Sequence, residues 1–402
     1  MTEREVVFVE GVRTPFGRMG GGLSDFVASE LAGIGIKGLL SKTEVNDKAK
    51  VDSVFLGSAT HCSKALNPAR WATLDAGLGH ETTASYIEMQ CGSAIDSINH
   101  AAWKIFAGQA DIVIAGGTES YSQMPAKFSM STAPYRLIPP MPIEQTLSPI
   151  TEECIGMGET AENLQKMYNI PRVASDEFAY NSQMKAKAAW EAGYFEEEII
   201  PVKIPATRKT PEIVIDKDEH PRFNTTLEGL AGLRPAFSKD GTVTAGNASG
   251  RNDGSAFVLM MSAEKAKELG YEPMARWICG TDHGVDPKIM GIAPAYAMAQ
   301  AIKRAGLQLS DMDVMECNEA FAVQNLAVIE ELENQTGDKV DMKNWNPLGG
   351  AIAYGHPNGA SGARICMFAM RELIRRSGRY GIFGSCCGGG LGAATLIENL
   401  KK

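Results

Sequence analysis

The 402-residue sequence lacks several features that would assign it to particular classes of protein. No apolar run approaches the roughly 20 residues that a membrane-spanning helix needs. Basic residues are outnumbered, 39 Lys and Arg against 48 Asp and Glu, and the net charge is −9. A nucleic-acid-binding surface is therefore not expected, because neutralising phosphates needs a clustered basic excess. No secretory signal, lipidation motif or peroxisomal tail is visible, so we expect a soluble, cytoplasmic protein.

The eight cysteines include no Cys-x-x-Cys pair, and the six histidines are scattered along the chain. We therefore expect no metal site. Without a secretory signal, the cysteines, Cys62 among them, are expected to be free thiols. Cys279 and Cys366 lie in apolar segments and are expected to be small core residues. Cys91 and Cys386 lie instead beside glycines and polar residues.

Short β-branched runs alternate with segments of helical periodicity along most of the chain. Such alternation predicts parallel sheet covered by helices on both faces. The expected strands are residues 6–9, 51–56, 112–115, 257–261, 277–279 and 314–317. The expected helices are residues 24–40, 94–107, 293–305 and 363–376.

Two segments far apart in the chain share one arrangement, which predicts a duplicated α/β unit. Residues 91–94 lead into a helix, the strand 111–115 and a glycine pair. Residues 358–362 lead into a helix, the strand 380–384 and three glycines.

The segment 120–248 does not continue the alternation of strands and helices. It is predicted to be a large excursion from the core that forms a lid or an assembly surface. Two helices are expected in it, at 160–168 and 175–192, the second with Ser175 as its N-cap. Prolines crowd its first part and argue against regular structure there. These are Pro125, Pro134, Pro139, Pro140, Pro142 and Pro149.

Two residues are candidates for a nucleophile and a base. Cys91 lies between a strand and a helix, where the helix dipole favours a thiolate. The alternative is a small residue filling a tight turn. His356 lies in the glycine-rich segment 349–362, which could hold it rigidly as a base. A lone histidine is otherwise commonly structural or solvated.

Two further segments could support such chemistry. Cys386 and Cys387 precede three glycines whose amides could form an oxyanion hole; the alternatives are a vicinal disulfide or a simple bend. Asn318 could hold a water or a carbonyl oxygen, and Glu319 could orient a histidine, although both residue types are common at helix starts. Together, two thiols, one histidine and backbone donors suit acyl transfer with proton abstraction next to a carbonyl.

Over essentially its whole length the chain resembles the thiolase family, the acetyl-CoA acetyltransferases and 3-oxoacyl-CoA thiolases. The resemblance implies two similar α/β halves in a five-layered αβαβα core, with a loop domain inserted in the first half. The implied divisions are 1–120 joined by 249–272, the insertion 121–248, and 273–402. The motifs are the Cys91 segment and residues 13–17, 116–120, 157–163, 234–237, 244–250, 318–321, 355–359 and 386–390.

The resemblance also implies a role for each site residue. Cys91 would attack the acyl group and carry it. His356 would take the Cys91 proton and hold the substrate oxyanion together with a water on Asn318. Cys386 would move the proton at the α-carbon, and the amides of Cys91 and Gly388 would form a second oxyanion hole. The reaction would run in either direction.

The family implies a substrate but no permanently bound cofactor. Arg222 and Ser249 match positions that contact coenzyme A, which serves as substrate. Met157 and Met290 match positions that line the acyl pocket. The chain is expected to form a homodimer or homotetramer.

Two departures from the family pattern bear on the acyl group. Gly156 stands where acetoacetyl-specific members usually have histidine, and Arg251 stands where an apolar residue is common. They suggest a bulkier, carboxylated 3-oxoacyl-CoA with Arg251 as the carboxylate partner. A benzoylsuccinyl-CoA thiolase with a small accessory subunit is one such member. The alternatives are an acetoacetyl-CoA-forming enzyme and a surface Arg251 paired with Asp253.

Two other functional interpretations compete with that of a thiolase. A 3-oxoacyl synthase of the same superfamily would use one cysteine with two histidines, or with a histidine and an asparagine. Cys386 argues against it, because that enzyme needs no second cysteine before the glycines. A non-catalytic thiolase-like lipid carrier or scaffold would not need Cys91, His356 and Cys386 together.

Overall fold

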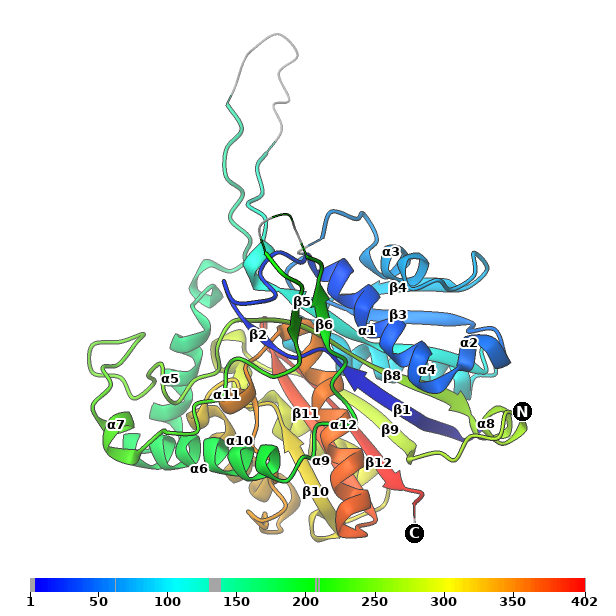
Figure 1. Cartoon of the computed structure of the whole chain (residues 1–402). Helices are drawn as coiled ribbons and strands as arrows, with labels where there is room; N and C mark the ends of the chain where they lie inside the picture. Colours follow the sequence, from blue (N-terminus) through cyan, green and yellow to red (C-terminus); the bar gives the residue numbers. More distant parts are fainter. Residues whose placement is uncertain (1–3, 62, 130–138, 207, 209, 402) are drawn as a thin grey trace.

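A ten-stranded sheet runs through the computed structural model, which describes residues 4–401 except 62, 130–138, 207 and 209 (Figure 1). Nine strands follow one another across it, and the short β2 (Gly17–Arg18) pairs with β8 at one side. The order is β10 (Met312–Cys317), β11 (Tyr380–Cys387), β12 (Leu391–Asn399), β9 (Ala275–Gly284), β1 (Val6–Arg13), β8 (Asn252–Ser262), β5 (Ile112–Ser120), β3 (Ser53–Gly57) and β4 (Thr83–Ile87).

The central strands are buried on both faces. Every residue of β5 and β8 is buried. Burial on both faces is expected for strands that contain an uninterrupted run of apolar residues. All six runs predicted as strands fall on strands of this sheet: β1, β3, β5, β8, β9 and β10.

The strand order occurs twice, and this confirms the predicted duplication. In the first half, β1 pairs antiparallel with β8, β8 antiparallel with β5, and β5 parallel with β3. In the second half, β9, β12, β11 and β10 repeat those pairings in the same sequence. The two halves meet where β1 pairs antiparallel with β9.

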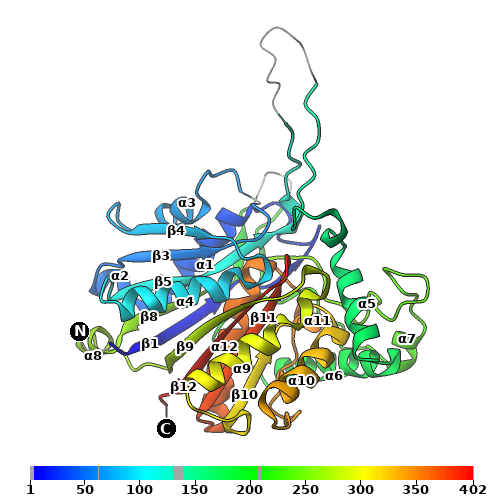
Figure 2. The same cartoon turned by 180° about the vertical axis from the view of Figure 1, so that it is seen from behind.

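Helices cover both halves and also fill the space between them, which gives five layers (Figure 1, Figure 2). The first outer layer is α1 (Ala28–Thr43) and α3 (Pro68–Asp75). The middle layer is α4 (Ser93–Phe106) and α12 (Asn358–Arg376), which contact each other. The second outer layer is α9 (Ala293–Arg304) and α10 (Ala322–Thr336). Cys91 and His356 lie just before the two middle helices.

Three predicted helices, at 160–168, 175–192 and 363–376, begin three or more residues earlier in the structure, and the helix predicted at 24–40 begins later, at Ala28. The helix α12 begins at Asn358, five residues early, because glycines in its first turns allow close packing rather than a loop. A side chain at Gly362 would lie 2.7 Å from the Ile95 amide nitrogen. The helix α6 (Arg172–Glu191) begins after Pro171, whose fixed φ suits a helix start. Ser175 is therefore a buried residue inside the helix and not its N-cap.

The excursion from the core forms the remaining part of the chain. Its helices include α5 (Met157–Met167) and α7 (Leu227–Ala231), and β6 (Val202–Ile204) pairs with β7 (Ile213–Ile215). The other short helices of the chain are α2 (Val45–Lys48), α8 (Ala263–Glu268) and α11 (Ala351–Tyr354).

The proline-rich part of the excursion extends away from the body as an arm, which we define as residues 124–129 and 139–150 (Figure 1). Its two sides touch through one bridge, Phe128 with Pro142, and the Ser129 amide donates to the Met141 carbonyl at 2.8 Å. Pro134 lies outside the described residues, as does Cys62. Within the described chain, no helix is long and apolar enough to cross a membrane.

Candidate active site

Cys91 lies in a tight turn, Gln90–Gly92, directly before α4. The Ser93 hydroxyl fixes the turn, since it accepts from the Met89 amide at 2.9 Å and donates to the Gln90 carbonyl at 2.7 Å. A side chain at Gly92 would collide with the Cys387 sulfur. The turn therefore packs directly against the end of β11.

The environment of Cys91 favours the neutral thiol. Burial is the largest cause of its raised pKa, and the charges of Cys386 and Glu119 raise it further. The amides of Cys91 and Gly388 hydrogen-bond to the sulfur and oppose this rise. The helix-start position predicts a thiolate, but in the folded protein desolvation outweighs the helix dipole.

Cys386 lies near the end of β11 and is fully buried. Its charge acts on Cys91, so the structure brings the two sulfurs of the two halves together. Burial raises the pKa of Cys386, and nearby Cys317 raises it further. Cys386 and Cys387 are both free, so they form no vicinal disulfide. Cys279 is only half-buried, whereas Cys366 is buried, and both are free thiols.

His356 lies between α11 and α12, and its main chain is held by Asn252. The His356 amide donates to Asn252 Oδ1 at 3.0 Å, and a side chain at Gly355 (φ +91°) would collide with the same amide group. The start of α12 packs against the turn that carries Cys91. The helix that follows the histidine therefore lies against the turn that carries Cys91.

Hydrogen bonds define the tautomer of His356. The Ser361 hydroxyl donates to the Pro357 carbonyl at 3.2 Å, so its oxygen is free to accept the Nδ1 proton of His356 at 2.6 Å. The Asn318 amide nitrogen lies 3.4 Å from Nε2, which leaves Nε2 with the lone pair. Burial and the charge of Arg364 lower the pKa of His356 to about 3. The ring is a neutral base at physiological pH.

Asn318 follows β10 and is held beside β11. Its backbone amide donates to the Gly384 carbonyl at 2.9 Å. Its side-chain oxygen Oδ1 is buried and has no partner among the residues described. The structure thus brings Asn318 next to His356.

Glu319 does not orient the histidine, contrary to the sequence-based expectation. Its carboxylate accepts from the Ser182 hydroxyl at 2.6 Å and from Asn346 Nδ2 at 3.0 Å. Through Ser182 it bonds to α6 and braces the insertion against the second half. Ser361 holds the histidine instead. The signal that could have found it is a hydroxyl on the first turn of the helix after the histidine.

The glycines after Cys387 form the turn into β12. Gly389 and Gly390 have φ of +88° and +86°, which favours glycine. The Gly388 amide reaches the Cys91 sulfur. A side chain at Gly388 would lie 2.9 Å from Leu147 Cδ1, so the base of the arm covers this part of the site. The sequence did not predict that cover.

Glu119 connects the first half to the middle layer. It is fully buried at the end of β5 and accepts from the Ser58 hydroxyl at 3.1 Å and the Ala59 amide at 2.9 Å. It also accepts from the Gly359 amide, at 3.1 Å, at the start of α12. Glu119, in the 116–120 motif, therefore holds the end of β5 to the start of α12, the helix that follows His356.

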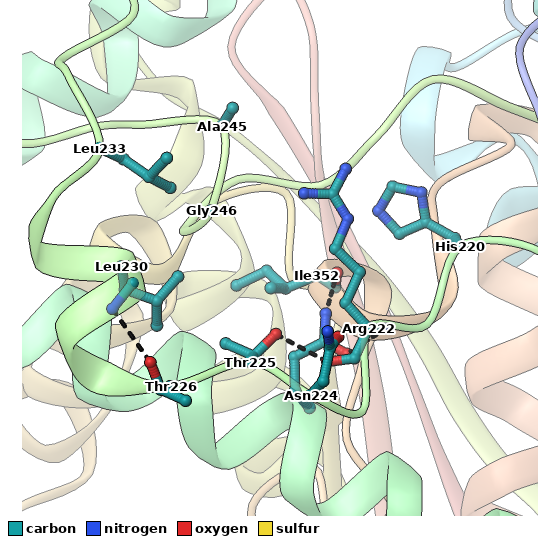
Figure 3. Close-up of a pocket in the computed structure, with 12 residues that line it drawn as sticks. His220, Arg222, Asn224, Thr225, Thr226, Leu230, Leu233, Ala245, Gly246 and Ile352 are labelled. Atoms are coloured by element: carbon teal, nitrogen blue, oxygen red, sulfur yellow. Dashed lines mark hydrogen bonds between the residues drawn. The ribbon is translucent and has the colours of Figure 1, made fainter.

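A cavity of about 230 Å³ lies beside the site in the insertion. Figure 3 shows Arg222 and His220 next to each other on one side, with Leu233 and Ala245 across from them. The Arg222 amide donates to Gln183 at 2.9 Å. Burial and the positive charges of Arg222 and Arg18 lower the pKa of His220 to about 4.

Ser249 is not among the residues that line this cavity. Its amide donates to the Ala320 carbonyl at 3.0 Å, which places it between the cavity and the Asn318 segment. The sequence missed His220, which faces Gly250.

The two methionines predicted to line the acyl pocket belong to the same apolar cluster as Cys386. Met290 is buried in that cluster, and Met157, at the start of α5, packs against it. The adjacent Gly156 is exposed, and a side chain there would meet no atom closer than 3.5 Å. Space is thus left open beside Met157.

Arg251 lies directly beside His356, because the two backbones form an isolated parallel bridge. Its guanidinium is exposed and lies 5.9 Å from the centre of the Tyr121 ring. It does not pair with Asp253, which is buried and accepts from the Ser122 amide at 3.0 Å. The alternative of an Arg251–Asp253 surface pair is therefore wrong.

The described ranges contain no cluster of three or more His, Cys, Asp or Glu side chains that could hold a metal ion. The site thus consists of two thiols, a neutral histidine, an amide side chain and backbone donors, gathered from two similar halves. That is the composition of an acyl-transfer site without a metal ligand set.

Comparisons with known proteins agree with this class. The family model "Thiolase, N-terminal domain" matches residues 6–264, and "Thiolase, C-terminal domain" matches residues 271–399. The acetyl-CoA acetyltransferase of Thiocystis violacea is 43% identical over 98% of this chain and 99% of its own. The chain belongs to the thiolase family, a family of acyltransferase enzymes.

Two other relatives carry different names. The β-ketoadipyl-CoA thiolase of Acinetobacter baylyi is 42% identical, with 99% of this chain and 100% of its own covered. Human mitochondrial 3-ketoacyl-CoA thiolase in complex with CoA has a TM-score of 0.89 and 40% identity, with 98% of each chain covered. The fold is therefore the thiolase fold.

Proposed function

We propose that this enzyme cleaves a 3-oxoacyl-CoA with coenzyme A, and runs the reverse Claisen condensation, through an acyl group carried on Cys91. The observation that supports this most is the convergence of Cys91, Cys386, His356 and Asn318 from the two halves. A thiolase needs one thiol to carry the acyl group and a second to move a proton at carbon.

In the cleavage direction, His356 Nε2 takes the Cys91 proton as the sulfur attacks the 3-oxo carbon. The bond between the 2- and 3-carbons breaks, and the electron pair moves to the departing thioester, which takes a proton from Cys386. The thiol of coenzyme A then attacks the acyl group on Cys91 and gives its proton to Cys386. The acyl-CoA leaves, and the Cys91 sulfur takes its proton back from His356.

Two sets of donors would hold the negative charge. His356, once protonated, and a water on Asn318 would hold the oxygen of the attacked carbonyl. The amides of Cys91 and Gly388 would hold the other thioester oxygen. Removing one such donor in comparable sites costs on the order of 10²–10³ in kcat.

Coenzyme A is proposed to bind in the cavity beside the site. Arg222 supplies a guanidinium for its phosphates, and the Ser249 amide donates to the Ala320 carbonyl, two residues after Asn318. The human relative in complex with CoA supports coenzyme A as a ligand. No permanently bound cofactor is proposed.

The acyl group is proposed to be bulkier than acetyl and to carry a carboxylate. The open space beside Gly156 and Met157 leaves room for it, and Arg251 beside His356 has a guanidinium without an ion pair to any described residue. The name of the A. baylyi relative denotes a dicarboxylic acyl group. The name of the T. violacea relative favours the alternative, acetoacetyl-CoA.

The first experiment is mass spectrometry of the protein incubated with a panel of acidic and neutral 3-oxoacyl-CoAs. We expect a mass increase on the peptide that contains Cys91, and none in the Cys91→Ala variant. Label on another residue, or no label with any member, would contradict the proposal and favour a non-catalytic carrier.

The second experiment compares kcat/KM of Arg251→Leu on acidic and neutral substrates. We expect a loss of about tenfold or more on the acidic substrate alone, because one charged hydrogen-bond pair is removed. Arg251→Lys is the matched control and should retain part of the preference. Equal losses on both substrates would remove Arg251 from the acyl pocket.

Assembly as a homodimer is proposed through β4, whose outer edge has no strand beside it within the described chain. Exposed strand edges pair readily with a second copy. Ser85 is exposed on this strand, so Ser85→Lys should shift the mass measured by light scattering from dimer to monomer. An unchanged mass would place the interface elsewhere, for example on the arm, which is also where a small accessory subunit could bind.

A further inference from the structure

Gln90, the residue directly before Cys91, has a backbone conformation that favours glycine. Its φ is +47°, in the left-handed region that residues with a side chain seldom adopt. A glutamine stays in such a conformation only when its surroundings hold it there, and residues held in this way cluster at functional sites. The groups that hold Gln90 therefore bear on the site.

Glu88 holds Gln90 through one carboxylate oxygen. Glu88 Oε1 accepts from the Gln90 main-chain amide at 2.8 Å and from Gln90 Nε2 at 2.6 Å. A charged acceptor makes shorter and stronger hydrogen bonds than a neutral one. Glu88, which directly follows β4, thus fixes both the main chain and the side chain of Gln90.

The peptide unit between Gln90 and Cys91 is fixed at its carbonyl as well. The Gln90 carbonyl accepts from the Ser93 hydroxyl at 2.7 Å and from the Ser93 amide. Because a peptide unit is planar and trans, its N–H, which belongs to Cys91, points opposite to this carbonyl. The direction of the Cys91 amide therefore follows from the conformation of Gln90.

The side chain of Gln90 lies against Gly388, the other residue whose amide holds a substrate oxygen in the proposed function. A side chain at Gly388 would lie 3.3 Å from Gln90 Cγ and 3.6 Å from Gln90 Oε1. The bond from Nε2 to Glu88 fixes the amide end of this same side chain. Through Gln90, Glu88 thus acts on the main chain at Cys91 and at Gly388.

We propose that Glu88 is a positioning residue for acyl transfer: by holding Gln90 in its left-handed conformation, it aims the Cys91 amide, beside that of Gly388, at the negative oxygen of the reacting substrate. The inference rests on the proposed acyl transfer through Cys91. Backbone amides stabilise an oxyanion most when they are aimed at it before the reaction, and a small misplacement costs a large part of the rate.

The first test removes the acceptor and compares steady-state rates. Glu88→Ala should lower kcat by about tenfold or more while KM for coenzyme A stays within about threefold, because the amides act on the transition state and not on binding. Glu88→Gln is the matched control, since its side-chain oxygen still accepts hydrogen bonds while its charge is gone. It should retain most of the rate. A glutamine variant as slow as the alanine variant would mean that the charge matters and not the hydrogen bonds, and would overturn the proposal.

The second test separates the direction of the amide from the position of the sulfur. Iodoacetamide reacts with a thiol at a saturated carbon and develops no oxyanion, so Glu88→Ala should leave the alkylation rate of Cys91 within about threefold of the wild type. Acylation of Cys91 by a 3-oxoacyl-CoA, quenched rapidly and measured by mass spectrometry, should slow by about tenfold or more. Equal slowing of the two reactions would mean that Glu88 merely holds the turn together, and would overturn the proposal.

The third test asks whether Glu88 acts by maintaining the left-handed φ. Glycine adopts a positive φ without help, so the double variant Glu88→Ala with Gln90→Gly should react faster than Glu88→Ala alone. A double variant that is no faster would show that Glu88 does not act through this conformation. Glu88 is exposed, so its replacement leaves no cavity in the core, and thermal unfolding of each variant checks that it is folded.

The outcomes separate this inference from the proposed function. A wild type that forms the acyl-enzyme, together with a folded Glu88→Ala variant of unchanged kcat, would overturn the role of Glu88 alone, because water would then satisfy the Gln90 amide equally well. Absence of acyl-enzyme in the wild type would instead refute the function, and the inference with it.

Discussion

Arg13 and Arg364 are two arginines with an exposed fraction of 0%, and their surroundings are opposite. The Nε of Arg13 pairs with Glu198 at 2.7 Å, and its two Nη atoms pair with Asp218 at 2.7 and 2.9 Å. Arg364 has aromatic rings on its faces and no hydrogen-bond partner among the described residues. The first fastens the insertion to β1, and the second lies in α12 without a hydrogen bond to any described residue. Burial of a charge does not by itself reveal its role; its partners do.

The largest effect on stability is expected at the paired arginine. Arg13→Met should reduce the free energy of unfolding by about 3–5 kcal/mol, because it leaves Glu198 and Asp218 buried without their partner. Urea denaturation followed by circular dichroism measures this. A loss below about 1 kcal/mol would show that the two carboxylates find other partners, and the contrast between the arginines would fail.

The second prediction concerns pH and the field of the unpaired arginine. Since the pKa of His356 is lowered from 6.5 to about 3 in the folded chain, the unfolded chain takes up a proton between these values and the folded chain does not. This contribution to stability is complete above pH 6.5 and is lost as the pH falls, by about 2 kcal/mol at pH 5.

The measurement is the free energy of unfolding against pH for the wild type and His356→Gln. Between pH 7 and 5 the variant should lose less stability than the wild type. Arg364→Met should lie between the two curves, because burial still lowers the pKa of His356 after the charge is removed. Superimposable curves for all three proteins would contradict both the lowered pKa of His356 and the contribution of Arg364 to it.

The smallest effect on stability is expected at the unpaired arginine. Arg364→Met should change the free energy of unfolding at pH 7 by about 1 kcal/mol or less, in either direction, because no ion pair is broken and an apolar chain fits between Phe368 and Tyr354. The same denaturation measurement as for Arg13→Met gives the comparison. A loss as large as that of Arg13→Met would mean that Arg364 is a structural residue.

The sequence predicted much of the fold and of the site because both depend on local patterns. Strands such as β5 and β8 each contain an apolar run, 112–115 and 256–261, and the repeated unit could be recognised from its own glycines. Cys91, His356, Cys386 and Asn318 each stand at a junction between a strand or loop and a helix or turn. Motifs of adjacent residues carried that information.

Errors arose where a distant partner decides the outcome. Glu319 was expected at the histidine, but Ser182 and Asn346, from other elements, hold it, and Ser361 holds the ring. Ser175 has the residue type of an N-cap, yet the helix begins earlier after Pro171. The thiolate expected at Cys91 from the helix dipole is disfavoured by burial, which a sequence does not show.

By itself the sequence determined the family and the duplicated α/β unit, and it gave the candidate site residues, because periodicity and contiguous motifs are properties of neighbouring positions. Only the tertiary structure decided which charges are neutralised. Whether Arg364 meets a carboxylate, whether Arg251 finds Asp253, and which atom of His356 carries the proton depend on how the folded segments pack against one another. The energies of charges and protons follow those distances and the exclusion of water around them.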